Sequence, residues 1–520
     1  MNDDADCFCS TILTPEFFST YWEERPLLVK AADFPDNPLP SMIDADTMMD
    51  ILGRIPDQLK IFKKGRAVAP SVSPWLAYLD GASLIVNMAD RTHPRLFAFC
   101  RELATRFFHH VFAVLYLTPP GTFAVNVHSD DQDTILVQLW GTKAWKVFGP
   151  LPGLRLILSD EMAGKSETVP TGAEGPPVLE CTLSAGDVLY IPRGHLHCAK
   201  TPESSQSLHV TLTVPSSDMN RGAALERTLG EIIRGPLRPQ DSMQIAATAA
   251  PVSTNSTSRP GGNVLDEEER LLLRRSVLKE DAVGGQGRGE RGNNGRESPE
   301  YAERIESILT KLRAALTEDN LRASFSAQMQ RVNSNQLRQH MRTMQTGPVM
   351  VGAGSAVTSR SQIRLDPEIE MTCEAGASEA CFEKRGGARL QMRIEPAAAD
   401  FLRAVRDAGE AGVSVKNLPV SNSDSFERLC LARLFVDKGV LQALSGSGET
   451  PNGSNGNGQN GNSDIPWERG SDVDPSPHPP LPSAAAGRRP TRHGGSSQAP
   501  PAGGGLPRVG AGVVPDLGRM

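Results

Sequence analysis

The chain has 520 residues, a formal net charge of −7 and a hydrophobic fraction of 39%. This is long enough for two or three domains, but the hydrophobic fraction is low for a chain that folds throughout. The negative charge argues against broad electrostatic binding to nucleic acid, and no apolar run approaches the roughly 20 residues of a membrane-spanning helix. The eight cysteines form no CxxC ladder, so we expect a reducing compartment rather than a disulfide framework.

Residues 1–83 are predicted to be mixed helical and to belong to the same unit as the strands that follow. The stretch TPEFFSTYWEERPLLV provides a threonine N-cap and an amphipathic helix that Pro26 ends. From residue 84 to 215 the pattern changes to short strands bounded by Gly and Pro: VFAVLYLTPPG, DTILVQLW, AWKVF, GDVLYIPRG and SLHVTLTV. Many short strands at this spacing predict a mainly β core, a sandwich or barrel of the jelly-roll type.

Beyond Pro215 the apolar period becomes helical. LERTLGEII and IESILTKLRAAL carry apolar residues at three- and four-residue steps, which predicts amphipathic helices over residues 216–345. The glycine-rich, charged insertion at 281–299 is expected to be disordered. Residues 346–385 are interpreted as a linker, 386–444 as a compact, largely helical unit, and 445–520, rich in Gly, Pro, Ser and Asn, as a disordered tail.

The segment HSDDQDTILVQLW begins an apolar strand with a charged cluster. His128 and Asp130 are two residues apart, so their side chains point to the same side of an extended segment. A second motif, GDVLYIPRGHLHCA, delivers His195 and His197 after a Pro-Arg-Gly turn. Two imidazoles and one carboxylate are the ligands of non-haem Fe(II) oxygenases. An HxD pair alone is usually a solvated strand edge or a cap, but the two motifs together predict a metal site, and spacing does not choose between His195 and His197.

Lys143 lies fifteen residues after His128, beyond a glycine turn expected at Gly141, on what should be the adjoining strand. A lysine carried by an inner strand is a costly buried charge unless an anion meets it. The distal carboxylate of 2-oxoglutarate would be such an anion. The ordinary alternative is a lysine exposed at a hairpin, because lysine is rarely buried.

The motifs YWEERPLLV, LYLTPPG, HSD, VQLWGTKAWKVF, GDVLYIPRGHLH and SLHVTLTV, in this order, resemble the JmjC oxygenases. The resemblance is to their ribosomal oxygenase branch, the bifunctional lysine-specific demethylase and histidyl-hydroxylase family. It runs from about Thr14 to Val214 and continues more weakly to Leu444. It implies a double-stranded β-helix (cupin jelly roll) over 84–215, a helical dimerisation region over 216–345 and a winged-helix-like module over 386–444.

The resemblance also implies the roles of the site residues. Its iron ligands correspond to His128, Asp130 and His197, which selects His197 over His195, and its cosubstrate lysine corresponds to Lys143. The cofactors implied are Fe(II), 2-oxoglutarate as cosubstrate and O2.

Two further cofactor-binding candidates match more weakly. Thr211, in the last strand, would make another cosubstrate contact, and Tyr116 matches a family tyrosine that could instead line the substrate groove. His209, beside Thr211, fits equally an ordinary core histidine. The chain departs from the branch at Val114, where asparagine is common, and at Ser129, where an aromatic residue is usual. These departures leave a reduced or lost activity open.

The activity implied is hydroxylation of a histidine or arginine side chain in a ribosomal protein. Two alternatives stay open: a histone lysine demethylase with the same iron site, and an inactive cupin that only binds. The helical region implies a homodimer, with packing inside one chain as the alternative. The nucleus, including the nucleolus, is the implied location, with the cytoplasm as the alternative. Residues 401–444 hold six basic and five acidic residues, too little charge for direct nucleic-acid binding.

Overall fold

The computed structural model of the chain describes residues 3–54, 56–68, 73–150, 174–234, 264–266, 268, 269, 273, 299–346, 357–420, 424–444, 468 and 469. All but the last residue of the expected disordered insertion at 281–299 and most of the expected disordered tail from 445 lie outside these residues. Among the described helices, none has both the length and the apolar character needed to cross a membrane. All eight cysteines are free thiols.

The N-terminal part is more than helical, because it also adds strands to the sheet of the core. Thr14 caps its first turn as predicted, since the Thr14 Oγ1 accepts a hydrogen bond from the backbone N–H of Phe17 at 3.2 Å. That turn ends at Tyr21, well before Pro26. The elements are α1 (Asp3–Ile12), η1 (Phe17–Tyr21), β1 (Leu27–Val29), η2 (Ala31–Asp33), η3 (Leu39–Ser41), α2 (Ala45–Arg54), η4 (Pro56–Gln58), β2 (Leu59–Lys63), β3 (Arg66–Val68), α3 (Pro74–Leu79), β4 (Ser83–Val86), η5 (Ala89–Thr92), α4 (Pro94–Leu103) and η6 (Ala104–Phe108).

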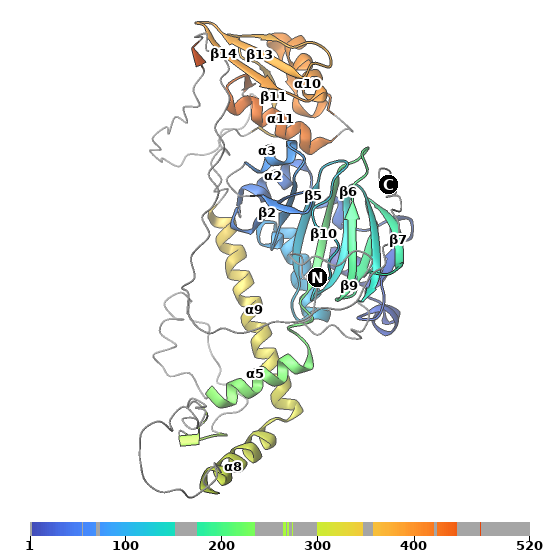
Figure 1. Cartoon of the computed structure of the whole chain (residues 1–520), viewed down its shortest axis with the longest axis vertical. Coiled ribbons are helices and arrows are strands. Elements are labelled where there is room, and N and C mark those ends of the chain that lie inside the picture. The colour runs from blue at the N-terminus through green and yellow to red at the C-terminus, as the bar shows by residue number, and fades with distance from the viewer. Residues whose placement is uncertain are drawn as a thin grey trace, which may run out of the picture. The chain divides into compact units, whose positions relative to one another are not determined.

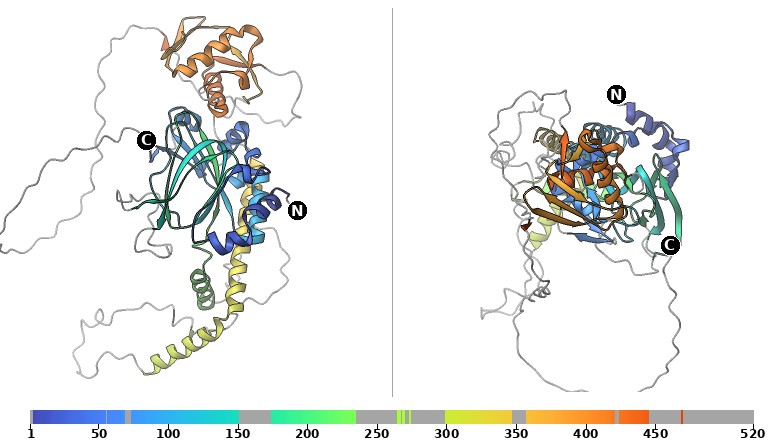
Figure 2. Two further views of the ribbon diagram at one scale, coloured as in Figure 1. Left: turned by 90° about the vertical axis from the view of Figure 1, so that its right-hand side faces the viewer. Right: turned by 90° about the horizontal axis from the view of Figure 1, so that it is seen from above.

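The core is a ten-stranded, entirely antiparallel arrangement, which confirms the predicted mainly β core. Its remaining strands are β5 (Phe112–Thr118), β6 (Asp133–Pro150), β7 (Pro177–Ser184), β8 (Val188–Ile191), β9 (His195–Lys200) and β10 (Ser207–Val214). The strand order is β1-β8-β6-β10-β5-β4-β2-β3, while β7 and β9 pair with the far half of β6. Figure 1 shows β5, β10, β6, β9 and β7 side by side, and the left view of Figure 2 shows these strands curving, with blue N-terminal helices beside them.

Strand β6 corrects one prediction, because no turn occurs at Gly141. The strand runs unbroken from Asp133 to Pro150: its first half pairs with β8 and β10 and its second half with β7 and β9. Gly141 has φ +61°, and a Cβ atom there would lie 1.8 Å from the carbonyl oxygen of Gln206. Glycine therefore lets the strand bend past a neighbouring backbone rather than turn back. Lys143 consequently lies on the same strand as the apolar run before it.

The core is packed from both faces of the central strands. All eight residues of β10 are buried, as expected for a strand with packed layers on both sides. One cluster joins the strands to the N-terminal helices and includes Phe8, Phe17 and Met48. A second cluster inside the strands is formed by Leu136, Trp145, Val147, Leu183, Leu189 and Ile191. The second cluster borders the site described below.

The helices that follow are α5 (Arg221–Arg234), α8 (Pro299–Ala315) and α9 (Glu318–Thr346). Helix α9 packs against η5 and α4 beside the β core of the same chain. The ring of His340 stacks on Phe97 at a centroid distance of 4.1 Å, and the Arg91 Nε donates to Gln336 Oε1 at 2.8 Å. Packing inside one chain, one of the two alternatives for this region, thus accounts for one face of α9.

The segment interpreted as a linker, 346–385, is instead partly folded. It carries β11 (Gln362–Leu365), β12 (Ile369–Thr372) and β13 (Glu379–Lys384), and the unit continues with β14 (Ala388–Arg393), α10 (Pro396–Asp407), η9 (Gly409–Ala411), β15 (Val413–Ser414), η10 (Val415–Asn417), α11 (Ser425–Asp437), β16 (Leu441–Leu444) and β17 (Glu468–Arg469). The strand orders are β15-β11-β16 and β12-β13-β14-β17. Ile363 and Phe382 are fully buried. Strands of four to six residues with few apolar positions have a weak pattern, so the sequence interpretation missed them.

Candidate metal centre and cosubstrate cavity

The backbone brings His128 and His197 together from segments far apart in the sequence. The two residues form an isolated antiparallel bridge: the His197 N–H donates to the His128 carbonyl at 2.8 Å, and the His128 N–H donates to the His197 carbonyl at 3.2 Å. Asp130 follows on the loop that leads into β6, and its carbonyl accepts a hydrogen bond from the Gly194 N–H at 2.8 Å. The Pro-Arg-Gly turn therefore holds the loop that carries the carboxylate.

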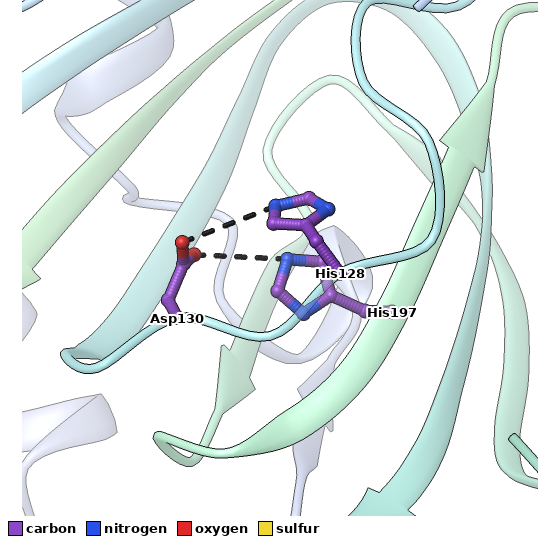
Figure 3. Close-up of side chains that lie close together, drawn as sticks. All are labelled: His128, Asp130 and His197. Carbon is purple, nitrogen blue, oxygen red and sulfur yellow. Dashed lines mark ion pairs between the residues drawn. The ribbon is translucent and has the colours of Figure 1, made fainter. Parts of the chain in front are cut away.

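The three side chains converge as Figure 3 shows. The Asp130 carboxylate lies 3.9 Å from His128 Nε2 and 3.7 Å from His197 Nε2. One potential ligand atom from each residue lies within 4.8 Å of the others. Within the described part of the chain, this is the one group of three or more such side chains that could share a metal ion.

Each imidazole is oriented by a backbone carbonyl on its far side. His128 Nδ1 lies 2.8 Å from the Asn126 carbonyl, and His197 Nδ1 lies 3.0 Å from the His195 carbonyl. A carbonyl only accepts, so both Nδ1 atoms carry a proton and both Nε2 atoms face the carboxylate, where each neutral ring offers a lone pair to a metal. Two neutral imidazoles and one carboxylate on one side of a point fit Fe(II) with open positions left for other ligands.

His195 lies outside this group. Its side chain is about as buried as that of His197, with 7% and 6% exposed, and burial lowers its pKa. Its contribution to the triad is the backbone carbonyl that orients His197. The structure thus brings together the three residues implied by the resemblance and separates them from their nearest rival.

A cavity extends from the triad into the strands and reaches Lys143. Lys143 is only 3% exposed, and its Nζ donates to Thr118 Oγ1 at 3.2 Å. No described carboxylate lies within ion-pair distance of it, and burial lowers the pKa of its ammonium group from 10.5 to about 7. The alternative of an exposed hairpin lysine is therefore wrong. A buried ammonium without a carboxylate partner is the group that an anionic ligand would stabilise.

The weaker candidates Tyr116 and Thr211 also line this cavity, and so does His209. Tyr116 and His209 face each other across β5 and β10, and their rings stack with centroids 4.8 Å apart. The sequence interpretation missed Trp145, which packs edge-on against His209 at 5.4 Å. Its spacing was a usable signal, because residues two apart on a strand share a face, so Trp145 faces the same side as Lys143.

The two departures from the family pattern are both buried. Val114 is 5% exposed and packs with Ile85, Phe112 and Ala124. Ser129, between the first two members of the triad, is 2% exposed. Neither residue belongs to the group of potential metal ligands, so the triad is complete without them.

A buried network holds the strand that follows the triad. Asp133 Oδ1 accepts from the Tyr190 hydroxyl at 2.6 Å and from the Arg193 N–H at 3.3 Å, and Oδ2 accepts from the Ser216 hydroxyl. The Tyr190 oxygen in turn accepts from the Glu23 N–H at 2.7 Å. Burial raises the pKa of the Asp133 carboxyl group. The acidic cluster at this strand start thus divides into Asp130, which faces the site, and Asp133, which joins four segments of the chain.

A larger groove, about 1410 Å³ in volume, is lined in part by residues of this network, Glu23, Arg193 and Ser216. Its lining includes Asp131, directly after the triad carboxylate, and Arg193, whose Nη2 pairs with Glu23 at 2.9 Å. Aromatic side chains contributed by Trp22 and Phe107 form another part of the wall. Sequence patterns carry no signal for this groove, because its walls come from five separate segments.

A curved antiparallel β core that brings a His-x-Asp pair and a distant histidine together at one end offers the ligand set of non-haem Fe(II) oxygenases. Residues 89–220 match the family described as the JmjC domain. A protein of Drosophila melanogaster named bifunctional lysine-specific demethylase and histidyl-hydroxylase NO66 is 33% identical over 221 residues, 39% of this chain and 32% of that protein. Ribosomal oxygenase 1 of Gallus gallus is 31% identical over 211 residues, 38% of this chain and 34% of that protein. The resemblance to the ribosomal oxygenase branch is confirmed.

The match spans about a quarter to a third of the length of these curated relatives. Among solved structures, the chain is similar to the ribosomal oxygenase YcfD of Escherichia coli, at 13% identity and a TM-score of 0.37, covering 83% of this chain and 98% of that one. A structure of YcfD in complex with cobalt and 2-oxoglutarate gives 14% identity and a TM-score of 0.34, with the same coverage.

Proposed function

We propose that this protein is an Fe(II)- and 2-oxoglutarate-dependent oxygenase that hydroxylates a histidine or arginine side chain of a ribosomal protein. The observation that carries the proposal is the convergence of His128, Asp130 and His197 at one end of a cavity that holds the buried ammonium of Lys143. The triad would hold Fe(II), and Lys143 would pair with the distal carboxylate of the cosubstrate.

Bound Fe(II), O2 and 2-oxoglutarate together supply the oxidising chemistry, in which a C–H bond becomes C–OH and the cosubstrate becomes succinate and carbon dioxide. The chain positions these groups. The carbonyls of Asn126 and His195 keep both imidazoles in the tautomer that presents Nε2. The Thr118 hydroxyl orients the Lys143 ammonium, which would make a charge-assisted hydrogen bond to the carboxylate. Thr211 and Tyr116 would complete the cosubstrate contacts.

The groove beside Asp131 and Arg193 is where a protein substrate would lie. It is much larger than a single side chain requires, and its lining includes Asp131, which follows Asp130 on the same loop. Aromatic and charged side chains suit an extended polypeptide, which needs both apolar contacts and hydrogen-bond partners for its backbone. The ribosomal target itself rests on the names of the relatives.

Two other functions are each suggested by a specific observation. The names of several relatives include lysine-specific demethylase, and the same site acting on an N-methyl group of a histone would release that group after hydroxylation, which would make the protein a chromatin regulator. A cupin that only binds its partner is suggested by Val114 and Ser129. The complete triad and the buried Lys143 favour an active enzyme over this second alternative.

The remaining regions have structural roles in this proposal. We assign residues 1–83 and 84–215 to one catalytic unit and 216–345 to a homodimer interface, because Leu225, Leu309, Leu337 and Met341 of α5, α8 and α9 are exposed large apolar side chains. The strands β15-β11-β16 with α10 and α11 support a winged-helix-like module. A nuclear location, including the nucleolus, is the part of this proposal that rests on the resemblance alone, and imaging of a tagged protein would test it.

The test is succinate formation from 2-oxoglutarate by the purified protein with Fe(II), with and without a ribosomal protein extract. We expect turnover that the extract stimulates and that His128→Ala and Lys143→Ala abolish. Lys146→Ala is the matched control, because Lys146 lies on the same strand but is half exposed and pairs with Glu180 at 3.2 Å. A protein in the extract should gain the mass of one oxygen atom. A protein that binds iron and 2-oxoglutarate but shows no turnover with any substrate preparation would favour the binding cupin.

A further inference from the structure

Trp145 provides a second buried donor in the cavity, beside Lys143. Its side chain is 5% exposed, and its indole Nε1–H has no hydrogen-bond acceptor among the described residues. Buried polar groups are almost always paired, and an unpaired one indicates a missing partner. The indole N–H is therefore a buried donor that a ligand in the cavity could satisfy.

The indole lies among the groups that a bound cosubstrate would contact. Lys143 Nζ is 5.7 Å from the centre of the Trp145 ring. The ring centroid is 6.2 Å from that of His197 and 5.4 Å from that of His209. Trp145 therefore borders both the ammonium group and a member of the metal triad.

The chemistry of the two donors selects the ligand. An indole N–H only donates and an ammonium only donates, whereas an ionised carboxylate only accepts, at two oxygens. We propose that Trp145 Nε1 donates a hydrogen bond to the carboxylate of 2-oxoglutarate that pairs with Lys143, so that Trp145 is a positioning residue for the cosubstrate. This inference rests on the proposed function, since it requires that 2-oxoglutarate binds in this cavity.

The first test observes the wild-type donor directly. The protein has five tryptophans, so a protein labelled with ¹⁵N at the indole nitrogens gives few resonances, and Trp145→Phe assigns the one of interest. With Zn(II) in place of Fe(II), we expect saturating 2-oxoglutarate to move the Trp145 indole proton resonance downfield. Saturating pyruvate, which lacks the distal carboxylate, should leave it in place. An unmoved resonance with 2-oxoglutarate, or an equal shift with pyruvate, would overturn the assignment.

The second test measures affinity by calorimetry with the Zn(II)-loaded protein. Trp145→Phe should weaken 2-oxoglutarate binding about tenfold, the effect of one hydrogen bond to a charged group, and leave Zn(II) affinity unchanged. Trp140→Phe is the matched control, because Trp140 is on the same strand but its Nε1 donates to the Ile43 carbonyl at 2.7 Å. Wild-type protein that does not bind 2-oxoglutarate would contradict the proposed function. Equal binding by wild type and Trp145→Phe would contradict only the role of Trp145.

Discussion

His128 and His197 pair with each other through their backbones, and this bridge holds their imidazole centroids 4.3 Å apart. The geometry of the metal centre therefore depends on strand β9 and on the loop before β6 being in register. Because strand side chains alternate in direction, a slip of one residue in β9 would replace His197 by a neighbour that points the other way.

The triad predicts which histidine of the motif binds metal. His197→Ala should lower the affinity for Co(II), used as a spectroscopic substitute for Fe(II), by at least about a hundredfold, since it removes a ligand rather than a supporting group. His195→Ala keeps the carbonyl that orients His197 and should bind Co(II) nearly as well as wild type. Titration of the Co(II) absorption bands measures both affinities. Similar losses in the two variants would mean that His195 is also a ligand.

Lys143 predicts that cosubstrate binding takes up a proton. In the free protein its pKa is about 7 because of burial, so at pH 8 most of the molecules carry a neutral amine. A carboxylate beside Lys143 favours the ammonium form and raises that pKa. Calorimetry at pH 8 in buffers of different ionisation enthalpy should show uptake of close to one proton per 2-oxoglutarate bound, and less at pH 6. Lys143→Met should abolish the uptake, whereas Lys146→Met should preserve it.

The lowered pKa of Lys143 also determines how the free energy of unfolding of the ligand-free protein changes with pH. In the unfolded chain Lys143 titrates near 10.5, and in the free folded protein near 7. Between these values the unfolded state binds more protons, so the contribution of Lys143 to the free energy of unfolding rises with pH from about 7 to about 10.5. Urea unfolding at several pH values in this window should show a smaller rise for Lys143→Met than for Lys146→Met. Equal slopes would mean that Lys143 is charged in the free protein.

Sequence patterns locate site residues that lie close together on one strand or loop, but they miss contacts between different strands. Periodicity tells which face a strand residue occupies, so His128 and Asp130 can be grouped from their spacing alone. It does not tell which strands become neighbours, and the contacts of Lys143 with Thr118 and of Trp145 with His209 both cross between strands. The choice of His197 came from resemblance to known oxygenases, since spacing alone could not make it.

Gly141 was misread for a related physical reason. Glycine marks turns and also strand positions where another backbone comes close, and only the packing decides between them. The strands β11 to β13 were missed because four to six residues with mixed polarity resemble a connecting segment. The mainly β core was predictable because many short apolar strands bounded by Gly and Pro recur between residues 84 and 215.

Gly141→Ala should destabilise the protein by about 3 kcal/mol, because alanine is strained at φ +61° and its Cβ would lie 1.8 Å from the Gln206 carbonyl oxygen. Gly149→Ala is the control on the same strand, where no heavy atom lies within 4 Å of the added Cβ. Thermal unfolding followed by circular dichroism measures both. Equal melting temperatures for Gly141→Ala and wild type would show that β6 does not need the close approach at this bend.

Asp133 predicts a stability effect that is separate from catalysis. Asp133→Asn replaces one of two accepting oxygens by a donor, while Tyr190, Ser216 and the Arg193 N–H all donate to this side chain. The loss of a buried acceptor should lower the free energy of unfolding by about 2 kcal/mol, measured by urea denaturation. Asp33→Asn, at an exposed carboxylate of η2, should change stability by less than about 0.5 kcal/mol. If Asp133→Asn unfolds at the same urea concentration as the control and the wild type, the network does not hold the start of β6. The position of Asp130 would then depend on its contact with Gly194.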